Sequence, residues 1–115
     1  MKASDRYFVD GVSCALRGRQ MPVANLSVGG LFAATDDPPM QGLVVALEIH
    51  IQGREPFEVL GRVSWVNAPA KPRAMDLPQG FGVKITQIAF PDKLAILDFL
   101  KRVSARTPKT TRGNA

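Results

Sequence analysis

The chain has 115 residues, 45% of them hydrophobic, which fits one domain with a modest core. Its longest apolar stretches fall far short of the roughly 20 residues that a membrane helix needs. Residues 1–6 (MKASDR) lack the apolar stretch of a secretory signal, so we expect a cytoplasmic protein without a membrane span.

The formal net charge of +5 would suit nucleic acid, but the position of the charge argues against that partner. Arg106, Lys109 and Arg112 lie in the last twelve residues, which contain no acid, and the rest of the chain carries 12 basic and 10 acidic residues. Residues 104–115 are predicted to be a disordered basic tail, because their composition cannot offset the entropy of ordering. A nucleic-acid role therefore ranks behind the functions considered below.

Short runs of β-forming residues alternate with turn signals along most of the chain. Gly18–Gln20 is a predicted turn, the paired Gly29 and Gly30 permit positive φ and close approach, and Asp36–Pro39 is a predicted loop. Three prolines mark residues 67–79 as another loop. The segments between these signals are predicted strands at 12–17, 21–26, 31–34, 43–51, 57–66 and 81–88.

The rhythm changes after Pro91. Leu94, Leu97 and Leu100 recur every three residues, which predicts a helix over 92–103 that Asp92 caps. Six short strands and one helix predict a mainly β domain over residues 1–103, a six-stranded antiparallel barrel with a C-terminal α-helix. Barrel closure removes the exposed edges of short strands.

Few residues suit catalysis or metal binding. Cys14 and His50 are the only cysteine and histidine, so no disulfide or zinc site is expected. Cys14 is interpreted as a buried structural thiol in preference to a reactive one, and His50 as a structural or exposed imidazole in preference to a catalytic one. No nucleophile elbow, phosphate-binding loop or dinucleotide fingerprint is present. The sequence therefore predicts neither an enzyme nor a cofactor.

The most informative segment is residues 25–30 (NLSVGG). Asn25 and Ser27 lie two residues apart at the end of a predicted strand, so their short polar side chains point the same way. Gly30 leaves room for a planar ligand to approach the main chain. Two interpretations stay open, a ligand site or a turn in which Asn25 and Ser27 bond their own backbone.

Three segments together resemble the PilZ domain family, whose members bind the bacterial second messenger cyclic di-GMP. Residues 25–30 resemble its Asp/Asn-x-Ser-x-x-Gly motif, residues 61–66 (GRVSWV) its late strand ending in tryptophan, and residues 80–85 (GFGVKI) its next strand. The resemblance covers residues 6–103 and implies the same barrel and helix that the periodicity predicts. It also implies cyclic di-GMP contacts by Asn25, Ser27, Gly29 and Gly30. Trp65 is either a core residue or a stacking platform at the ligand face.

The family's second motif, Arg-x-x-x-Arg, matches residues 6–10 (RYFVD) only in part. Arg6 is present, but Asp10 replaces the second arginine. Arginine pairs bidentately with phosphate and stacks on guanine, whereas an aspartate repels phosphate. Losing one charged hydrogen bond lowers affinity about 10- to 150-fold. Lys2, Arg17 and Arg19 are the nearby cations that could substitute.

Two functions follow from the resemblance. In the first, the domain is an adaptor that contacts a protein of a bacterial motility, pilus or surface-polysaccharide system, with weak or absent cyclic di-GMP binding. In the second, it is a cyclic di-GMP receptor that uses Arg6, Asn25, Ser27 and Gly30. Asp10 favours the adaptor, and the retained serine motif favours the receptor.

Overall fold

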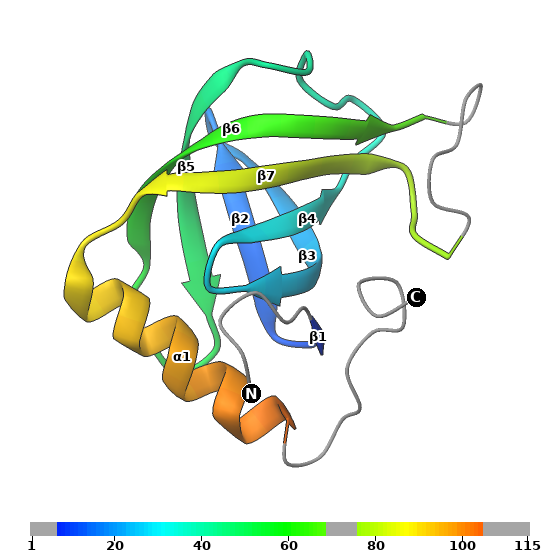
Figure 1. Cartoon of the computed structure of the whole chain (residues 1–115). Coiled ribbons are helices and arrows are strands. Elements are labelled where there is room, and N and C mark those ends of the chain that lie inside the picture. The colour runs from blue at the N-terminus through cyan, green and yellow to red at the C-terminus, as the bar shows by residue number, and fades with distance from the viewer. Residues whose placement is uncertain (1–6, 69–75, 105–115) are drawn as a thin grey trace.

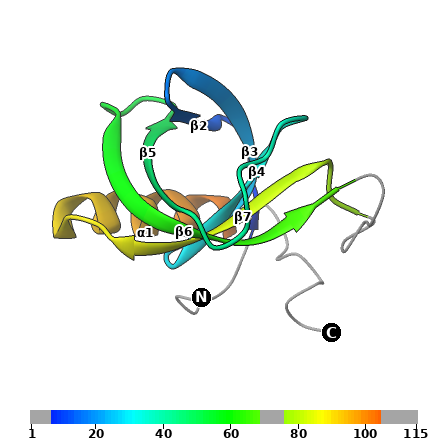
Figure 2. The same ribbon diagram turned by 90° about the horizontal axis from the view of Figure 1, so that it is seen from above.

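The computed structural model describes residues 7–68 and 76–104. Within them, six strands form a closed antiparallel barrel and one helix packs beside it, so the predicted fold class is confirmed (Figures 1 and 2). The elements are β1 (Tyr7–Phe8), β2 (Val12–Leu16), β3 (Arg19–Ser27), β4 (Gly30–Ala34), β5 (Val44–Ile51), β6 (Phe57–Asn67), β7 (Gly80–Gln87) and α1 (Phe90–Ser104).

The barrel strands follow one another in the order β3-β2-β5-β6-β7-β4, and pairing of β4 with β3 closes the ring. Viewed from above in Figure 2, the strands surround a central space that side chains fill. Every neighbouring pair is antiparallel. Closure gives each barrel strand partners on both sides, which leaves no long unpaired edge.

Strand β3 is long enough to serve three neighbours. Its first half, from Arg19 to Pro22, pairs with β2, and its second half pairs with β4 on one side and β1 on the other. The two-residue β1 was not predicted, because Tyr7 and Phe8 alone carry no period. It exists through its register on β3, where Tyr7 opposes Leu26.

The core lies inside the barrel and under α1. In β5 the buried and exposed residues alternate along the strand, as period-two patterning predicts. The fully buried side chains include Cys14, Leu26, Leu31, Leu47, Ile49, Val63, Phe81 and Ile96. Cys14 is therefore buried as predicted, and burial raises the pKa of its thiol to about 12.

Some predicted boundaries were wrong. The first turn is made by Arg17 and Gly18, whose φ values of 51° and 81° are those of a two-residue hairpin, so β3 already begins at Arg19. The helix begins at Phe90, which places Asp92 in its first turn instead of at the cap. At this position its carboxylate still interacts favourably with the positive end of the helix dipole. Ser104 ends the helix, and residues 105–115 of the predicted tail lie outside the described residues.

No helix in the described part of the chain is long and apolar enough to cross a membrane. The helix α1 has 15 residues and carries charged side chains in its first and last turns.

We expect the Cys14 thiol to resist modification in the folded protein. Its side chain is 0% exposed and its pKa is raised to about 12, so little thiolate forms at neutral pH. A chromogenic disulfide reagent at pH 8 should label the native protein only at the rate of unfolding and the denatured protein at once. Rapid labelling of the native protein would contradict this assignment.

Gly30 and Gly29 form a matched pair for a stability test. A Cβ atom at Gly30 would collide with the carbonyl oxygen of Val83, whereas one at Gly29 has nothing within 4 Å. We therefore expect Gly30→Ala to lower the free energy of unfolding by about 1–3 kcal/mol. Gly29→Ala should change it by less than about 0.5 kcal/mol. Urea denaturation measures both, and equal effects would show that the β4–β7 approach does not require glycine.

Candidate ligand-binding site

The outer surface of the barrel carries a row of residues that includes Asn25 and Trp65. In antiparallel sheets, directly opposed residues point to the same face. Their neighbours along the strands, such as Leu26 and Leu31, belong to the interior core, so this row faces outward. Register pairs join, in order, Phe8, Asn25, Phe32, Gly82 and Trp65 across β1, β3, β4, β7 and β6.

Asn25 is the exceptional member of this row. Its side chain is 4% exposed, and its Oδ1 is buried without a hydrogen-bond partner among the described residues. An unsatisfied buried polar atom costs about 1–3 kcal/mol. The other two buried polar side chains of the described part are satisfied by backbone. Ser27 donates to Gly30, and Asn67 donates to the carbonyl oxygens of Leu77 and Pro78.

Ser27 and Gly30 are accounted for by the β3–β4 turn itself. Ser27 Oγ donates to the carbonyl oxygen of Gly30 at 3.2 Å, and the two residues are register partners. Gly30 is required because β7 passes too close for a side chain. Neither glycine of the pair has positive φ, so close approach is the constraint that applies here. For these two residues the structure agrees with the turn interpretation.

Trp65 covers a small second apolar cluster outside the barrel. Its ring lies 5.2 Å from that of Phe32 at an interplanar angle of 39°, and Leu77 and Ala24 complete the cluster. Gly82 leaves space for the indole, because a Cβ there would collide with Trp65 Nε1. The tryptophan is half-buried. It therefore packs as a structural residue with part of its surface still open to solvent.

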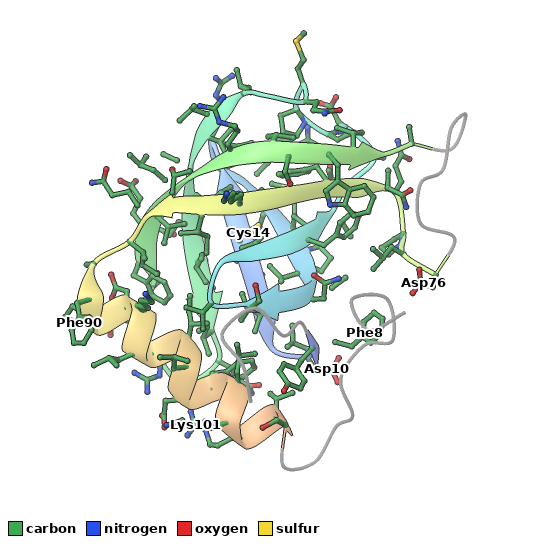
Figure 3. All side chains as sticks on the ribbon, viewed as in Figure 1. Phe8, Asp10, Cys14, Asp76, Phe90 and Lys101 are labelled. Carbon is green, nitrogen blue, oxygen red and sulfur yellow. The ribbon has the colours of Figure 1, made fainter. Side chains whose placement is uncertain are left out.

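Asp10 lies at a pocket between β1 and α1. The pocket has a volume of about 730 Å³ and is lined by Phe8, Val9 and Asp10 on one side and by Phe99, Arg102 and Val103 on the other. Asp10 is exposed, and Figure 3 shows it beside Phe8 near β1. Phe8 also opposes Asn25 in the outer row, so it joins this pocket to the candidate site. The predicted contact Arg6 lies outside the described residues.

Of the cations proposed to replace the missing arginine, the two that the structure describes do not lie at this site. Arg19 is at the opposite end of β3 from Ser27, about 26 Å away at the rise of an extended strand, and it forms an ion pair of 2.7 Å with Asp37. Arg17 lies in the adjacent turn. Lys2 is outside the described residues.

Sequence reasoning missed two cations that share a row with Ser27. Register pairs join Ser27, Gly30, Lys84 and Arg62 across β3, β4, β7 and β6, and both basic side chains are exposed. The signal was available in the sequence, because Lys84 is the only charged residue of the run 80–85. Their proximity to the serine motif depends on strand order, which the sequence did not reveal.

Metal-binding side chains are not clustered in the described part of the chain, where no group of three or more His, Cys, Asp and Glu could hold an ion. His50 is half-buried on β5, and its Nε2 lies 2.7 Å from Glu48 Oε1. The two groups on this strand are within ion-pair distance, but their geometry does not make a hydrogen bond.

Comparison with known proteins bears on both the fold and the family. The chain aligns with the structure of the Bacillus subtilis inhibitor of motility (MotI/DgrA) at a TM-score of 0.67 and 18% identity. The alignment covers 89% of this chain and 51% of that one, so this chain spans about half the length of MotI/DgrA. The crystal structure of the uncharacterized Legionella protein Lpg0364 aligns at a TM-score of 0.57 and 15% identity, covering 87% and 94%.

Both structural likenesses are below 25% identity and concern the fold alone. No curated protein matches the chain. The family model described as PilZ domain, however, matches residues 8–102, which is most of the chain. The barrel, the outer row around Asn25 and the terminal helix all fall within that match, and this protein therefore belongs to the PilZ domain family.

Proposed function

We propose that this domain is a cytoplasmic regulatory adaptor that acts by protein–protein contact and binds cyclic di-GMP weakly or not at all. The observation that carries the proposal is the exposed carboxylate of Asp10, at the position of the second arginine in the family's ligand motif. Control of motility, pili or surface polysaccharide is the role that its family and the likeness to a motility inhibitor support. No catalytic family is indicated.

The contacts of the retained serine motif support the adaptor. Ser27 and Gly30 both have structural reasons to be present, so their retention does not require a nucleotide. The row that contains Ser27 supplies Lys84 and Arg62, but Arg62 Nη1 already donates to the carbonyl oxygen of Gly42 at 3.4 Å. A lysine is a point charge and does not replace the bidentate fork of an arginine.

One observation favours the second candidate, a cyclic di-GMP receptor. Asn25 belongs to the outer row, and its buried Oδ1 has no partner among the described residues, so it could accept a hydrogen bond from a guanine edge. In that case Arg6, Asn25, Ser27, Gly29 and Gly30 would contact the ligand, and Trp65 would offer a stacking surface.

Calorimetric titration with cyclic di-GMP tests the adaptor proposal. We expect no saturable heat for the unmodified protein at several hundred micromolar nucleotide. Asp10→Arg should create binding, with a gain of about 10- to 150-fold, because it restores a charged hydrogen bond to phosphate.

Asp36→Arg, which makes the same charge change at the far end of β3, is the matched control and should remain without heat. Micromolar binding by the unmodified protein that is lost in Arg6→Ala would establish the receptor instead. If the Asp10→Arg protein does not bind cyclic di-GMP either, Asp10 is not the reason for weak binding, and the proposal loses its main support.

A pair of asparagine variants tests whether Asn25 is kept for a ligand. Asn25→Val should raise the free energy of unfolding by about 1 kcal/mol, because it removes an unsatisfied buried polar atom. Asn67→Val should lower it by about 1–3 kcal/mol, because it removes two hydrogen bonds to the 77–78 backbone.

Thermal and urea denaturation report both values. If Asn25→Val destabilises the free protein as much as Asn67→Val does, Asn25 has a structural partner, and its orphaned oxygen no longer favours the receptor.

A further inference from the structure

The start of α1 exposes two large apolar side chains where a surface helix is normally polar. The helix buries Ala95, Ile96, Leu100 and Val103 against the barrel. On the side turned to solvent, Phe90 is 69% exposed and Leu94 is 47% exposed. The two residues are one helical turn apart and therefore adjacent on the surface. Figure 3 shows Phe90 at the start of α1, pointing away from the barrel.

A hollow adjoins Phe90. It has a volume of about 720 Å³ and lies between the β3–β4 turn, the end of β7 and the start of α1, where its lining includes Val28, Gly29, Ile85, Ile88, Phe90 and Lys93. Ile85 and Ile88 are partly buried and pack on the core beneath it. Phe90, Leu94, Lys93 and this hollow make one continuous surface, which we call the α1 face.

The charge of the α1 face is positive. Lys93 lines the hollow, and Lys101 follows Leu94 and Leu97 at helical spacing. Both lysines are exposed and neither forms an ion pair with a described residue. Asp98 lies one turn after Leu94 on the same exposed side, and its carboxylate is paired with Arg54 at 3.0 Å and with Arg102 at 3.5 Å.

We propose that the α1 face is the docking surface of the adaptor and that it takes an acidic segment of another protein carrying a large apolar side chain. The proposal rests on the adaptor function proposed above. The apolar side chain enters the hollow beside Phe90, and carboxylates of the partner meet Lys93 and Lys101. Apolar anchors surrounded by complementary charge are the usual composition of such interfaces.

Two other occupants fit the surface less well. A second copy of this chain would bring the lysines of two α1 faces together, and like charges oppose that pairing. An anionic membrane would attract the lysines, but a flat lipid surface leaves the hollow beside Phe90 unfilled. The recess favours a side chain of a protein.

The position of the face also connects it to the candidate site. Val28 and Gly29 of the hollow lie between Ser27 and Gly30 of the turn, and Ile85 N–H donates to the carbonyl oxygen of Gly29 at 2.8 Å. A partner bound at the α1 face would therefore contact the same turn that carries the serine motif.

The test uses the 115-residue protein labelled with ¹⁵N and a blocked helical peptide with leucines at helical spacing and glutamates elsewhere. We expect the peptide to shift the amide resonances of residues 28–29, 85–88 and 90–97. Phe90→Ser should weaken binding at least about tenfold, as loss of a central apolar anchor does. Lys93→Glu should weaken it about fivefold.

Met40→Ser is the matched control, because Met40 is 78% exposed on the loop before β5, away from α1. It should bind like the unmodified protein. All three positions are exposed, so the variants should fold, and circular dichroism checks this.

Several results would overturn the proposal. They are the absence of shifts at millimolar peptide, equal binding of a peptide with lysine in place of glutamate, or shifts centred on another surface. Shifts caused by vesicles of phosphatidylglycerol and phosphatidylcholine, but not by the acidic peptide, would assign the face to membranes. Concentration-dependent dimerisation abolished by Phe90→Ser would assign it to a second copy. Each of these leaves the calorimetric test of Asp10 unaffected, so the two proposals fail separately.

Discussion

The architecture depends on the pairing of β3, which is the only strand in the described part that contacts three others. Its first half continues the sheet into β2, and its second half closes the ring through β4. A register shift between Val23 and Asn25 lies just after the part of β3 that pairs with β2, within the part that pairs with β4. Bulges of this kind bend a strand and increase its twist, which a small closed barrel requires. Without this pairing the sheet would have two open edges and no enclosed core.

The same pairing positions the candidate site. Closure places the end of β3 beside β4, whose other neighbour is β7, so Asn25 and Ser27 share an outer surface with residues of β6 and β7 that are far away in sequence. Close packing sets strict limits there, since Gly30 and Gly82 are both positions where a Cβ would collide with a neighbour. Close packing of the strands thus accounts for Gly30 of the serine motif and for Gly82 beside Trp65. The buried side-chain oxygen of Asn25, by contrast, has no hydrogen-bond partner among the described residues.

In the two proposals above, the charges on the protein give different roles to two regions of its surface. Near β1, the carboxylate of Asp10 reduces the attraction for a phosphate ligand. On the outer side of α1, Lys93 and Lys101 surround exposed apolar side chains and favour an acidic protein. The β3–β4 turn carries the serine motif, and its Val28 and Gly29 line the hollow beside Phe90. Under these proposals, one small domain presents both an altered ligand site and a docking surface.

Period-two patterning and turn residues were sufficient to predict the six barrel strands, because burial of one strand face imposes alternation on the sequence itself. Burial of Cys14 followed for the same reason. The three-residue spacing of Leu94, Leu97 and Leu100 predicted the helix. Local sequence signals failed where the backbone conformation depends on pairing with another strand. Strand β1 has two residues and exists only on β3, and the Arg17–Gly18 turn is set by the register of two strands.

Tertiary structure alone decided what the side chains face. Ser27 and Gly30 look like ligand residues in sequence, but in the fold Ser27 bonds the carbonyl oxygen of Gly30, and the approach of β7 leaves no room for a side chain at Gly30. Leu94 belongs to a leucine repeat typical of a buried stripe, yet the orientation of α1 leaves it exposed. Lys84 and Ser27 come together only through strand order. The sequence determines which residues of each strand alternate between buried and exposed. The residues that oppose them on neighbouring strands, or that pack against the helix, are far away in sequence, so only the closed barrel specifies these contacts.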